Sequence, residues 1–204
     1  MSHYFEPAPE VPPRELKEFE VRLAGAPARV VSAPGVFASG RLDLGTAQLL
    51  RTEDRLGGAI PATGQFLDLG CGWGPIALTL ARLAPAAQVW AVDVNPRALQ
   101  LAALNAERLG LANVRAALPG AVPAGLEFDL LWSNPPIRIG KDALRRLLRE
   151  WLGRLRAGAH ADLVVQKNLG ADSLSRWLDS EPGWRAAKLA SAKGYRIIRA
   201  ARTA

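Results

Sequence analysis

Two groups of residues have types and spacings suited to chemistry, and the first is a glycine-rich turn. An apolar run ends in Asp68, after which Gly70, Gly72 and Gly74 alternate with other residues before Pro75. Glycine accepts a positive φ and lets a ligand approach the main chain without meeting a Cβ atom. Proline is favoured in the first turn of a helix, where free N–H groups attract negative charge. The pattern predicts a strand, a tight turn and a helix that open onto a ligand site.

The spacing of these glycines limits the class of ligand. The pattern is G-x-G-x-G, and Pro75 stands where the G-x-G-x-x-G turn of dinucleotide sites has its third glycine, which makes nicotinamide cofactors less favoured. A second apolar run, residues 88–92, ends in Asp93, 23 residues past Gly70. A carboxylate at this separation binds ribose hydroxyls in nucleotide-binding sheets. Together the two signals predict a ligand that carries a ribose.

The second group is Asn134, Pro135 and Pro136, which follow a third apolar run at residues 128–133. Proline has no N–H, so successive prolines stiffen a turn and leave its carbonyl groups facing outward. The side-chain oxygen of Asn134 and the carbonyl of Pro135 could accept both N–H groups of an amine and aim its lone pair at an electrophile. Such a transfer needs position more than a strong base, because the proton becomes acidic only after the nitrogen is alkylated.

These motifs resemble those of a known enzyme class. LDLGCGWGP and VWAVDVNPRAL resemble the first two motifs of class I S-adenosylmethionine-dependent methyltransferases. VFASGRLDLGTAQLL, and SNPPI followed by RIGK, resemble the small-domain family of the ribosomal RNA guanine-N2 methyltransferases. VVQKNLGA and KGYRIIRA look like the tail of this family, so the resemblance covers nearly the whole chain. Residues 116–120 depart from it, because they lack the acid that contacts adenine in many members.

The resemblance implies a role for each motif residue. S-adenosylmethionine would be bound by Asp68, Gly70, Cys71, Gly72, Gly74, Asp93, Val94, Asn95 and Asn134, with Phe37, Asp43 and Thr46 from a segment that closes over it. The target amine would be held by Asn134, Pro135 and Pro136. The substrate-binding residues would be Ile137, Arg138, Lys141, Lys167 and Arg196. The implied reaction is methyl transfer to an exocyclic amino group, in first place N2 of guanine in small-subunit ribosomal RNA.

Three other functions stay open. N6-adenine methyltransferases of RNA or DNA and protein-glutamine N5 methyltransferases share the Asn-Pro-Pro motif, but there Tyr or Phe typically follows it, whereas Ile137 follows here. A rival of another class is a non-catalytic module that binds RNA or the cofactor, and the carbonyl-rich turn at Asn134 argues against it. Full-length members of the resembled family carry a second, inactive copy of the domain, for which 204 residues leave no room. Substrate recognition is then expected from the basic last third of the chain, from a homodimer or from a partner such as the small ribosomal subunit.

Composition excludes several classes of protein. With 204 residues, 49% of them hydrophobic, the chain is expected to form one globular domain. No run reaches the roughly 18 apolar residues of a membrane span and the first residues lack a signal-peptide core, so a cytoplasmic protein without membrane contact is expected. A single cysteine, Cys71, and two histidines, His3 and His160, rule out an intrachain disulfide and argue against a metal site.

Positive charge is concentrated toward the end of the chain. Residues 1–140 carry 12 Lys and Arg against 13 Asp and Glu, whereas residues 141–204 carry 14 against 6. Because a basic face attracts polyanions, the final third is expected either to bind ribosomal RNA or to serve as a solvated surface. Lys167 and Arg196 are the candidate phosphate contacts in this region.

The elements that must position these residues alternate between strands and helices. Besides the three apolar runs, strands are expected at 18–24, 28–32, 113–118, 161–166, 184–192 and 195–201. Helices are expected at 46–55, 75–83, 96–109 and around 173–178, with a further apolar helical stripe from Leu144 to Leu155. Strand–helix–strand repeats predict a parallel sheet with helices on both faces and a ligand at the carboxyl ends of its strands.

With the resemblance, these elements predict an α/β, Rossmann-like class I methyltransferase fold. Its sheet is expected to be mostly parallel and seven-stranded, with one antiparallel strand near the edge. Residues 1–45 are expected to form an N-terminal extension with a hairpin and a cofactor-covering segment, and residues 46–204 the methyltransferase domain.

Overall fold

The computed structural model describes residues 11–56 and 60–203, and the side chains of all of these except 52–56. The described chain begins with a 3₁₀ turn, η1 (Pro13–Glu15), and an antiparallel hairpin of β1 (Lys17–Leu23) and β2 (Ala26–Ser32). The predicted N-terminal hairpin is thus confirmed. The placement of a domain boundary at residue 45 stays a prediction.

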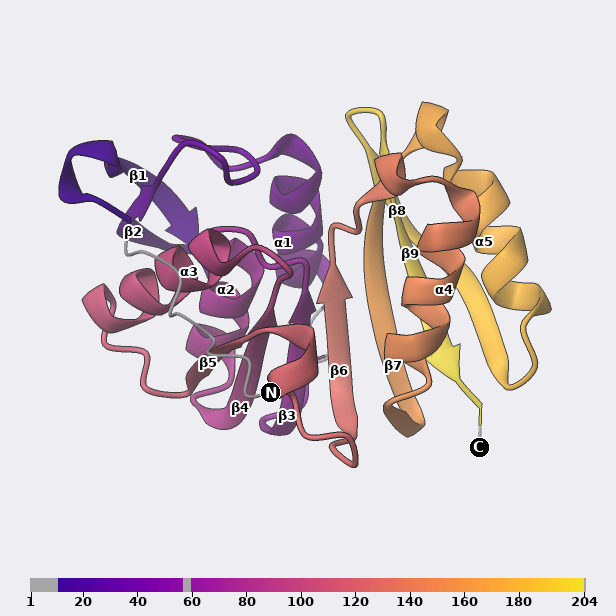
Figure 1. Ribbon diagram of the computed structural model, residues 1–204. Coiled ribbons are helices and arrows are strands. Elements are labelled where there is room, and N and C mark those ends of the chain that lie inside the picture. The colour runs from indigo at the N-terminus through magenta and orange to yellow at the C-terminus, as the bar shows by residue number, and fades with distance from the viewer. Residues whose placement is uncertain (1–10, 57–59, 204) are drawn as a thin grey trace, which may run out of the picture.

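A seven-stranded sheet follows, with the strand order β5-β4-β3-β6-β7-β9-β8 (Figure 1). Its strands are β3 (Thr63–Leu69), β4 (Ala86–Val92), β5 (Val114–Ala117), β6 (Phe128–Ser133), β7 (Leu155–Gln166), β8 (Trp184–Ala192) and β9 (Tyr195–Arg202). Pairing is parallel from β5 through β7, and β9 runs antiparallel to both of its neighbours. The mostly parallel sheet with one reversed strand near its edge is therefore confirmed.

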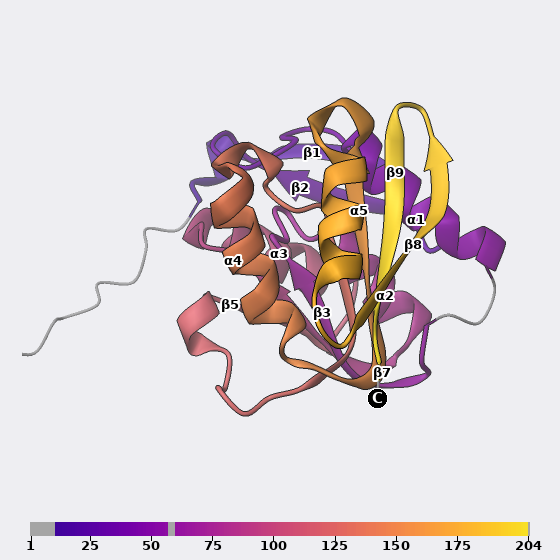
Figure 2. The same cartoon turned by 90° about the vertical axis from the view of Figure 1, so that its right-hand side faces the viewer.

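Helices cover both faces of this sheet. They are α1 (Leu44–Leu56), α2 (Pro75–Leu83), α3 (Pro96–Arg108), α4 (Lys141–Leu152) and α5 (Ala171–Ser180), with 3₁₀ turns η2 (Pro119–Ala121), η3 (Ile137–Ile139) and η4 (Lys167–Leu169). The sheet separates two buried apolar clusters, one formed with α1, α2, α3 and the hairpin, the other with α4 and α5. Figure 2 shows α4 on one side of the sheet and α1 and α2 on the other. This double cover leaves the carboxyl ends of the strands as the open edge.

Several predicted element ends differ from the observed ones, most clearly after α4. The apolar stripe predicts a helix that continues to Leu155, but α4 ends at Leu152 and Leu155 opens β7, which starts six residues earlier than the expected 161. Leu155 is fully buried in β7, and an apolar residue is equally expected on the buried face of a helix, so its type could not distinguish helix from strand. Gly153 is the C-cap of α4.

The basic final third is more internally paired than its charge suggests. Arg199 of β9 makes two hydrogen bonds, of 2.8 and 2.7 Å, to the carboxylate of Asp162 in β7, and Asp162 is 1% exposed. Arg149 pairs in the same two-bonded manner with Glu181. Arg154 donates to the carbonyl oxygens of Leu126 and Pro123. Much of this positive charge therefore holds the β7–β9 half of the molecule together.

Replacing Arg199 by alanine should lower the free energy of unfolding by roughly 3–5 kcal/mol, because the carboxylate of Asp162 would stay buried without its ionic partner. Chemical denaturation monitored by circular dichroism measures this change. The control is Arg29→Ala, whose ion pairs with Glu18 and Glu20 are solvent-exposed and should matter little. Equal, small losses in both variants would contradict a structural role for the Arg199 pair.

Candidate active site

The carboxyl ends of three adjacent parallel strands bring the two predicted groups of residues together. In the register of the sheet, Leu69 of β3 lies opposite both Val92 of β4 and Ser133 of β6. These three strand ends are directly followed by Gly70, Asp93 and Asn134. The three residues therefore leave the sheet at one level. The Ser133 hydroxyl donates to the carbonyl oxygen of Leu69 at 2.6 Å and fixes the β3 and β6 ends to each other.

The glycine turn takes the backbone that its sequence requires. Gly70, Gly72 and Gly74 have φ values of 77°, 55° and 96°, all in the left-handed region that favours glycine. Gly74 is the N-cap of α2, and a Cβ there would come within 3.2 Å of Ala102 in α3. The turn thus depends on glycine both for its conformation and, at Gly74, for close helix packing.

Asp93 organises this turn as well as facing the crevice. Its Oδ2 accepts a hydrogen bond from the backbone N–H of Gly72 at 3.0 Å, and its Oδ1 accepts one from the N–H of Asn95 at 2.9 Å. A carboxylate has about four acceptor positions, so both oxygens can still take a hydroxyl group. Val94, next in the chain, is 79% exposed beside the crevice.

The N-terminal segment is anchored over this edge. Asn95 donates to the carbonyl oxygen of Gly35 at 2.9 Å. The buried Asn105 side chain of α3 bonds both the N–H and the carbonyl oxygen of Val31, and also the carbonyl oxygen of Trp73. Phe19 packs edge-on against the Trp73 ring, with the centroids 5.3 Å apart. The hairpin and the glycine turn are therefore held to each other through α3.

Asp68 lies beneath the turn and is fully buried. Its Oδ2 accepts a hydrogen bond from the N–H of Ala77, while its Oδ1 has no partner among the described residues. Burial raises the pKa of Asp68 from 3.8 to about 8, against the lowering effect of the Ala77 bond and with a further rise from the charge of Asp93. In the protein without its ligand, Asp68 is thus mostly protonated at pH 7.

The raised pKa of Asp68 makes stability depend on pH. Between about pH 4 and 8 the folded state holds a proton that the unfolded chain has released, so the free energy of unfolding should fall as the pH rises through this window. Asp68→Asn stays neutral at every pH and can still accept from Ala77, so it should gain stability relative to the wild type from pH 5 to 8. Denaturation at several pH values measures the difference, and a difference independent of pH would contradict the buried protonated acid.

Cys71 is buried within the same turn. Burial, with the nearby charges of Asp68 and Asp93, raises the pKa of the Cys71 thiol well above its usual value. A thiol held in its neutral form is a poor nucleophile, which agrees with its interpretation as a small packing residue.

A hydrogen-bonded network fixes the orientation of Asn134. Its Nδ2 donates to Oδ2 of Asp43 at 2.9 Å and to Oγ1 of Thr46 at 3.1 Å, and the same Asp43 oxygen accepts the N–H of Thr46 at 3.0 Å at the start of α1. A carboxylate can only accept, so it determines which end of the amide faces it. The Asn134 Oδ1 atom is thereby turned away from Asp43 and available as an acceptor.

The proline pair forms a tight turn, and the Pro135 carbonyl accepts one hydrogen bond within that turn. The Pro135 carbonyl oxygen accepts the N–H of Ile137 at 2.8 Å, and Pro136 has φ −74° and ψ 74°, as in an inverse γ-turn. One of the two lone pairs of the Pro135 carbonyl is therefore engaged within the turn. The second remains for a ligand.

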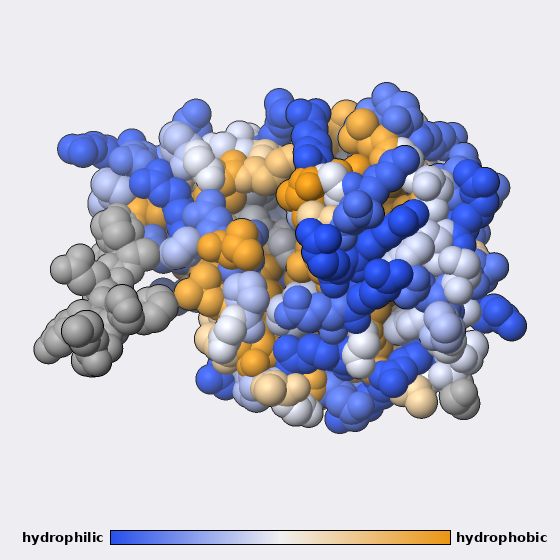
Figure 3. All heavy atoms as spheres, turned by 45° about the vertical axis from the view of Figure 1, so that its right-hand side comes forward, coloured by the Kyte–Doolittle hydropathy of each residue, from blue (hydrophilic) through white to orange (hydrophobic). Residues whose placement is uncertain are grey.

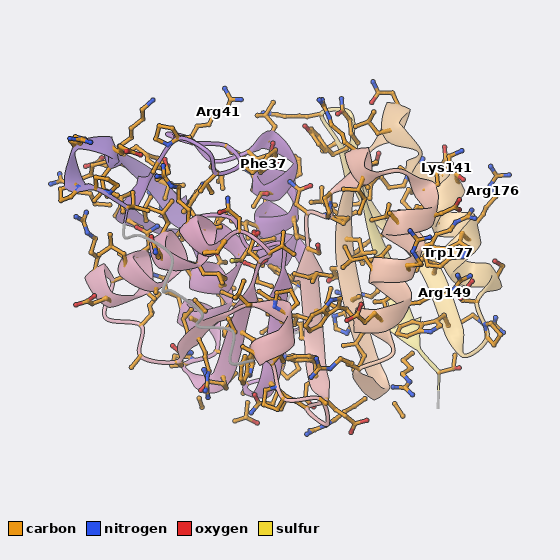
Figure 4. All side chains as sticks on the ribbon, viewed as in Figure 1. Phe37, Arg41, Lys141, Arg149, Arg176 and Trp177 are labelled. Carbon is orange, nitrogen blue, oxygen red and sulfur yellow. The ribbon has the colours of Figure 1, made fainter. Side chains whose placement is uncertain are left out.

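One pocket gathers most of the residues expected to bind the cofactor. It is lined by Phe37, Ala38, Asp43, Thr46, Gly70, Cys71, Gly72, Trp73, Pro75, Ile76 and Asn134. Figure 4 shows Phe37 in the loop between β2 and α1, at the upper edge of the molecule. Asp68 lies in β3, just before the glycine turn, and Gly74 is the N-cap of α2. Asp93, Val94 and Asn95 directly follow β4.

Sequence reasoning missed Trp73, Ile76 and Tyr195 at this site. Trp73 and Ile76 line the pocket, and the signal available was that Trp73 lies within the G-x-G-x-G-P stretch and Ile76 directly follows it. A Cβ on Gly45 would meet the Tyr195 ring at 2.8 Å and Oδ2 of Asp43 at 3.0 Å, so Tyr195 packs beside the Asn134 network. Burial, and then the charge of Asp43, raises the pKa of Tyr195. Nothing in the sequence near residue 195 indicated this proximity.

The expected substrate-binding residues do not all lie together. Ile137, Arg138 and Lys141 line a second cavity, next to the proline turn. Lys167 is exposed after β7, and Arg196 forms an ion pair with Asp172. The second of these two candidate phosphate contacts is thus already engaged with a carboxylate.

This arrangement is suited to binding a polar ligand. The glycine turn and the Asn134 amide line one pocket, and the Asp93 carboxylate holds the N–H of Gly72 in that turn. In the described part of the chain, no three His, Cys, Asp or Glu side chains are placed to hold a metal ion. None of the helices described is long and apolar enough to cross a membrane.

Comparison with known proteins identifies one matching family and several relatives by sequence. The family model "Methyltransferase small domain" matches residues 27–199. Ribosomal RNA small subunit methyltransferase C of Pseudomonas entomophila is 37% identical over 201 residues, which cover 96% of this chain and 58% of that protein. The protein YbxB of Bacillus subtilis is 32% identical, with 97% of both chains covered.

Among solved structures, the T. thermophilus 16S rRNA N2 G1207 methyltransferase (RsmC), in complex with AdoMet and guanosine, matches with a TM-score of 0.80 and 27% identity, over 97% of this chain and 53% of that one. A methyltransferase from Pyrococcus furiosus, 17% identical with a TM-score of 0.67, shares the fold. The chain spans about half the length of the methyltransferase C relatives that it matches, and nearly the full length of YbxB.

Proposed function

The chain belongs to the methyltransferase small domain family of class I S-adenosylmethionine-dependent methyltransferases, and we propose that it methylates N2 of guanine in small-subunit ribosomal RNA. The observation that carries this proposal is the Asn134 amide, which Asp43 orients with its oxygen outward in the pocket that the glycine turn also lines. The relatives that bear the name ribosomal RNA small subunit methyltransferase C, and the guanosine in the T. thermophilus complex, support the choice of substrate.

The residues present fit the cofactor. The glycine turn has positive φ angles and no side chains beyond the small Cys71 and the inward-packed Trp73, so main-chain atoms are accessible. Asp93 would bind the ribose hydroxyls, with Val94 and Asn95 beside the base. The Oδ1 atom of Asp68 has no partner among the described residues, and a cationic ammonium group would favour the ionised carboxylate and be accepted there. Phe37, Asp43 and Thr46 would border the methionine end.

When bound, S-adenosylmethionine supplies an electrophilic methyl group on its sulfonium. The protein then positions the guanine amine. The Asn134 Oδ1 atom accepts one N–H, and the free lone pair of the Pro135 carbonyl accepts the other, which leaves the nitrogen lone pair facing the crevice. Position and local electrostatics supply the rate in this scheme, and the proton that leaves after methylation passes to water.

Several features of the whole protein belong to this proposal. We place the substrate-facing surface on the described chain itself, because the exposed cations nearest the proline turn, Arg138 and Lys141, are available there. The expected partners are ribosomal RNA or the small ribosomal subunit. A homodimer and the division into an extension and a domain at residue 45 are further parts of the proposal.

Transfer of a labelled methyl group tests the function. Purified protein is incubated with labelled S-adenosylmethionine and, separately, with naked ribosomal RNA, small subunits and total protein, and the product is analysed by nucleoside and peptide mass spectrometry. The expected product is N2-methylguanosine in RNA. Label in N6-methyladenosine or in methylglutamine would redirect the proposal to those enzymes, and cofactor binding without transfer to any substrate would make the protein a binding module.

A further inference from the structure

A second cavity lies beside the proline turn, apart from the cofactor pocket. It measures about 230 Å³ and opens at the same edge of the sheet, between the start of α4 with η3 and the start of α5 with η4. Its lining residues are Ile137, Arg138, Gly140, Lys141, Leu144, Arg145, Val165, Leu169, Gly170, Ser173 and Leu174. Ligand pockets for drug-sized molecules range from about 300 to 1,000 Å³, so this cavity suits a smaller, single planar group.

The floor and the rim of the cavity differ in character. Leu144, Val165 and Leu174 are buried and give an apolar floor. Arg138 and Lys141 are exposed at the rim, and Arg145 leans over the ring of Trp177, with its guanidinium carbon 5.6 Å from the ring centroid. A group with a flat apolar face and an attached negative charge matches this distribution.

The described lining of this cavity carries positive charge and no negative charge. No Asp or Glu lines the cavity. Among the described residues no ion pair is found for Arg138, Lys141 or Arg145, whereas Arg149 and Arg196 are paired with carboxylates. Figure 4 shows Lys141 at the upper end of α4, and Arg149 and Trp177 lower down where α4 and α5 adjoin. Within the described chain, three cations without an ion pair thus border this one cavity.

Apolar side chains are also exposed along this edge of the sheet. In the described part of the chain, five of the six large hydrophobic residues with high exposure follow strand ends or lie in the covering segment here, namely Phe37, Leu44, Val94, Ile139 and Leu169. In Figure 3 orange side chains lie next to the hydrophilic band on the half that contains α4 and α5. Sites for single-stranded nucleic acid combine cations that meet the phosphates with side chains, typically aromatic, on which bases stack. Here mainly aliphatic side chains would supply the surface for a base.

We propose that this cavity binds the nucleotide next to the methylated guanosine, with its base on the Leu144 floor and its phosphate at Arg138 and Lys141. Ile137 and Arg138 follow Asn134-Pro135-Pro136 directly, so the same short loop faces the target base on one side and the cavity on the other. A strand that leaves its target base at Asn134 therefore reaches the cavity with its adjoining nucleotide. The inference rests on the proposed RNA substrate and names how the RNA is held.

The test uses single-stranded RNA heptamers with one central guanosine. Three probes are compared, intact, abasic on the 5′ side of the guanosine and abasic on its 3′ side, and their affinities for the full protein with S-adenosylhomocysteine are measured by fluorescence anisotropy. Loss of the base on one side should weaken binding about 5- to 150-fold, and loss on the other side should weaken it much less. Ser173→Leu, which fills the cavity without changing charge, should reduce the affinity of intact RNA to that of the sensitive abasic probe.

A matched pair of double variants tests the binding of the phosphate. Arg138→Gln/Lys141→Gln removes two charges from the rim, and Arg146→Gln/Arg176→Gln removes two exposed charges from α4 and α5 outside the cavity. The rim variant should flatten the dependence of log affinity on log salt by about 0.7 for each phosphate that no longer meets a cation, and the control should leave it nearly unchanged. Unaltered cofactor affinity, measured by calorimetry, shows that each variant is folded.

The inference is overturned if neither abasic probe loses affinity, if Ser173→Leu still discriminates between the probes, if the two double variants behave alike, or if RNA does not bind. These outcomes are separate from the identity of the methylated atom. Mass spectrometry that finds N2-methylguanosine while the abasic probes bind like intact RNA refutes the cavity and keeps the proposed function. If one abasic probe binds weakly but no N2-methylguanosine is found, the cavity is kept and the proposed reaction is refuted.

Discussion

Asn134→Ala should lower the single-turnover rate of methyl transfer about 100- to 1,000-fold and change the affinity for S-adenosylmethionine far less. The variant loses one of two acceptors for the target amine, and loss of one positioned hydrogen-bonding group at a reacting centre costs on the order of 3–4 kcal/mol. The cofactor turn and Asp93 are untouched. Rates at saturating cofactor, with affinity from calorimetry, separate the two effects, and a variant within about five-fold of the wild type would move the chemistry to another residue.

The hydrogen bond between Asn134 and Asp43 permits a stricter version of this test. Asn134→Asp alone places two carboxylates where an amide now donates across 2.9 Å, so their repulsion should disturb the acceptor and lower the rate. The double variant Asp43→Asn/Asn134→Asp restores a donor facing an acceptor, with their places exchanged. Because the Asp43 oxygen that faces Asn134 also accepts the N–H of Thr46, the exchange gives up that second bond, and only part of the missing rate should return. A double variant slower than Asn134→Asp would contradict orientation by Asp43.

The sequence predicted the sheet, and the edge of the sheet at which the site lies, because both depend on local patterns. Apolar runs that end in Asp68, Asp93 and Asn134 indicated strand ends, and parallel strands must place such ends at one edge. The G-x-G-x-G-P stretch predicted positive φ angles and a helix start, as observed at Gly74. Each of these inferences needs only residues within a few positions of one another.

The interactions that the sequence could not predict join residues far apart in the chain. Asp43 and Asn134 are separated by 91 positions, and Asp43 was assigned to the cofactor with no indication that it orients the amide. Asp162 and Arg199 are 37 positions apart, so the count of charges in the last third overstated the cations that RNA can reach. Pairing of this kind is decided by strand order and register, and neither is contained in a local pattern.

The second large effect is expected at Asp93, which serves the cofactor in two ways. Its oxygens would bind the ribose hydroxyls, and they already hold the N–H groups of Gly72 and Asn95. Removal of the carboxylate therefore takes away its hydrogen bonds to the ligand and also releases the turn that presents the main chain. The structure adds this second contribution to the ribose binding that the spacing of the motifs predicted.

Asp93→Ala should weaken S-adenosylmethionine binding by roughly 1.5–3 kcal/mol, about ten-fold to over one-hundred-fold, because charge-assisted hydrogen bonds are removed. Asp93→Asn keeps the size and one acceptor, yet its NH₂ group must face an N–H donor of Gly72 or Asn95, so it should rescue little. Glu107→Ala, on the exposed side of α3, removes the same charge and should bind normally. Calorimetry measures all three affinities. If Asp93→Ala bound as tightly as Glu107→Ala, neither the ribose hydrogen bonds nor the anchoring of Gly72 could contribute to binding, and the cofactor would have to be held by the glycine turn alone.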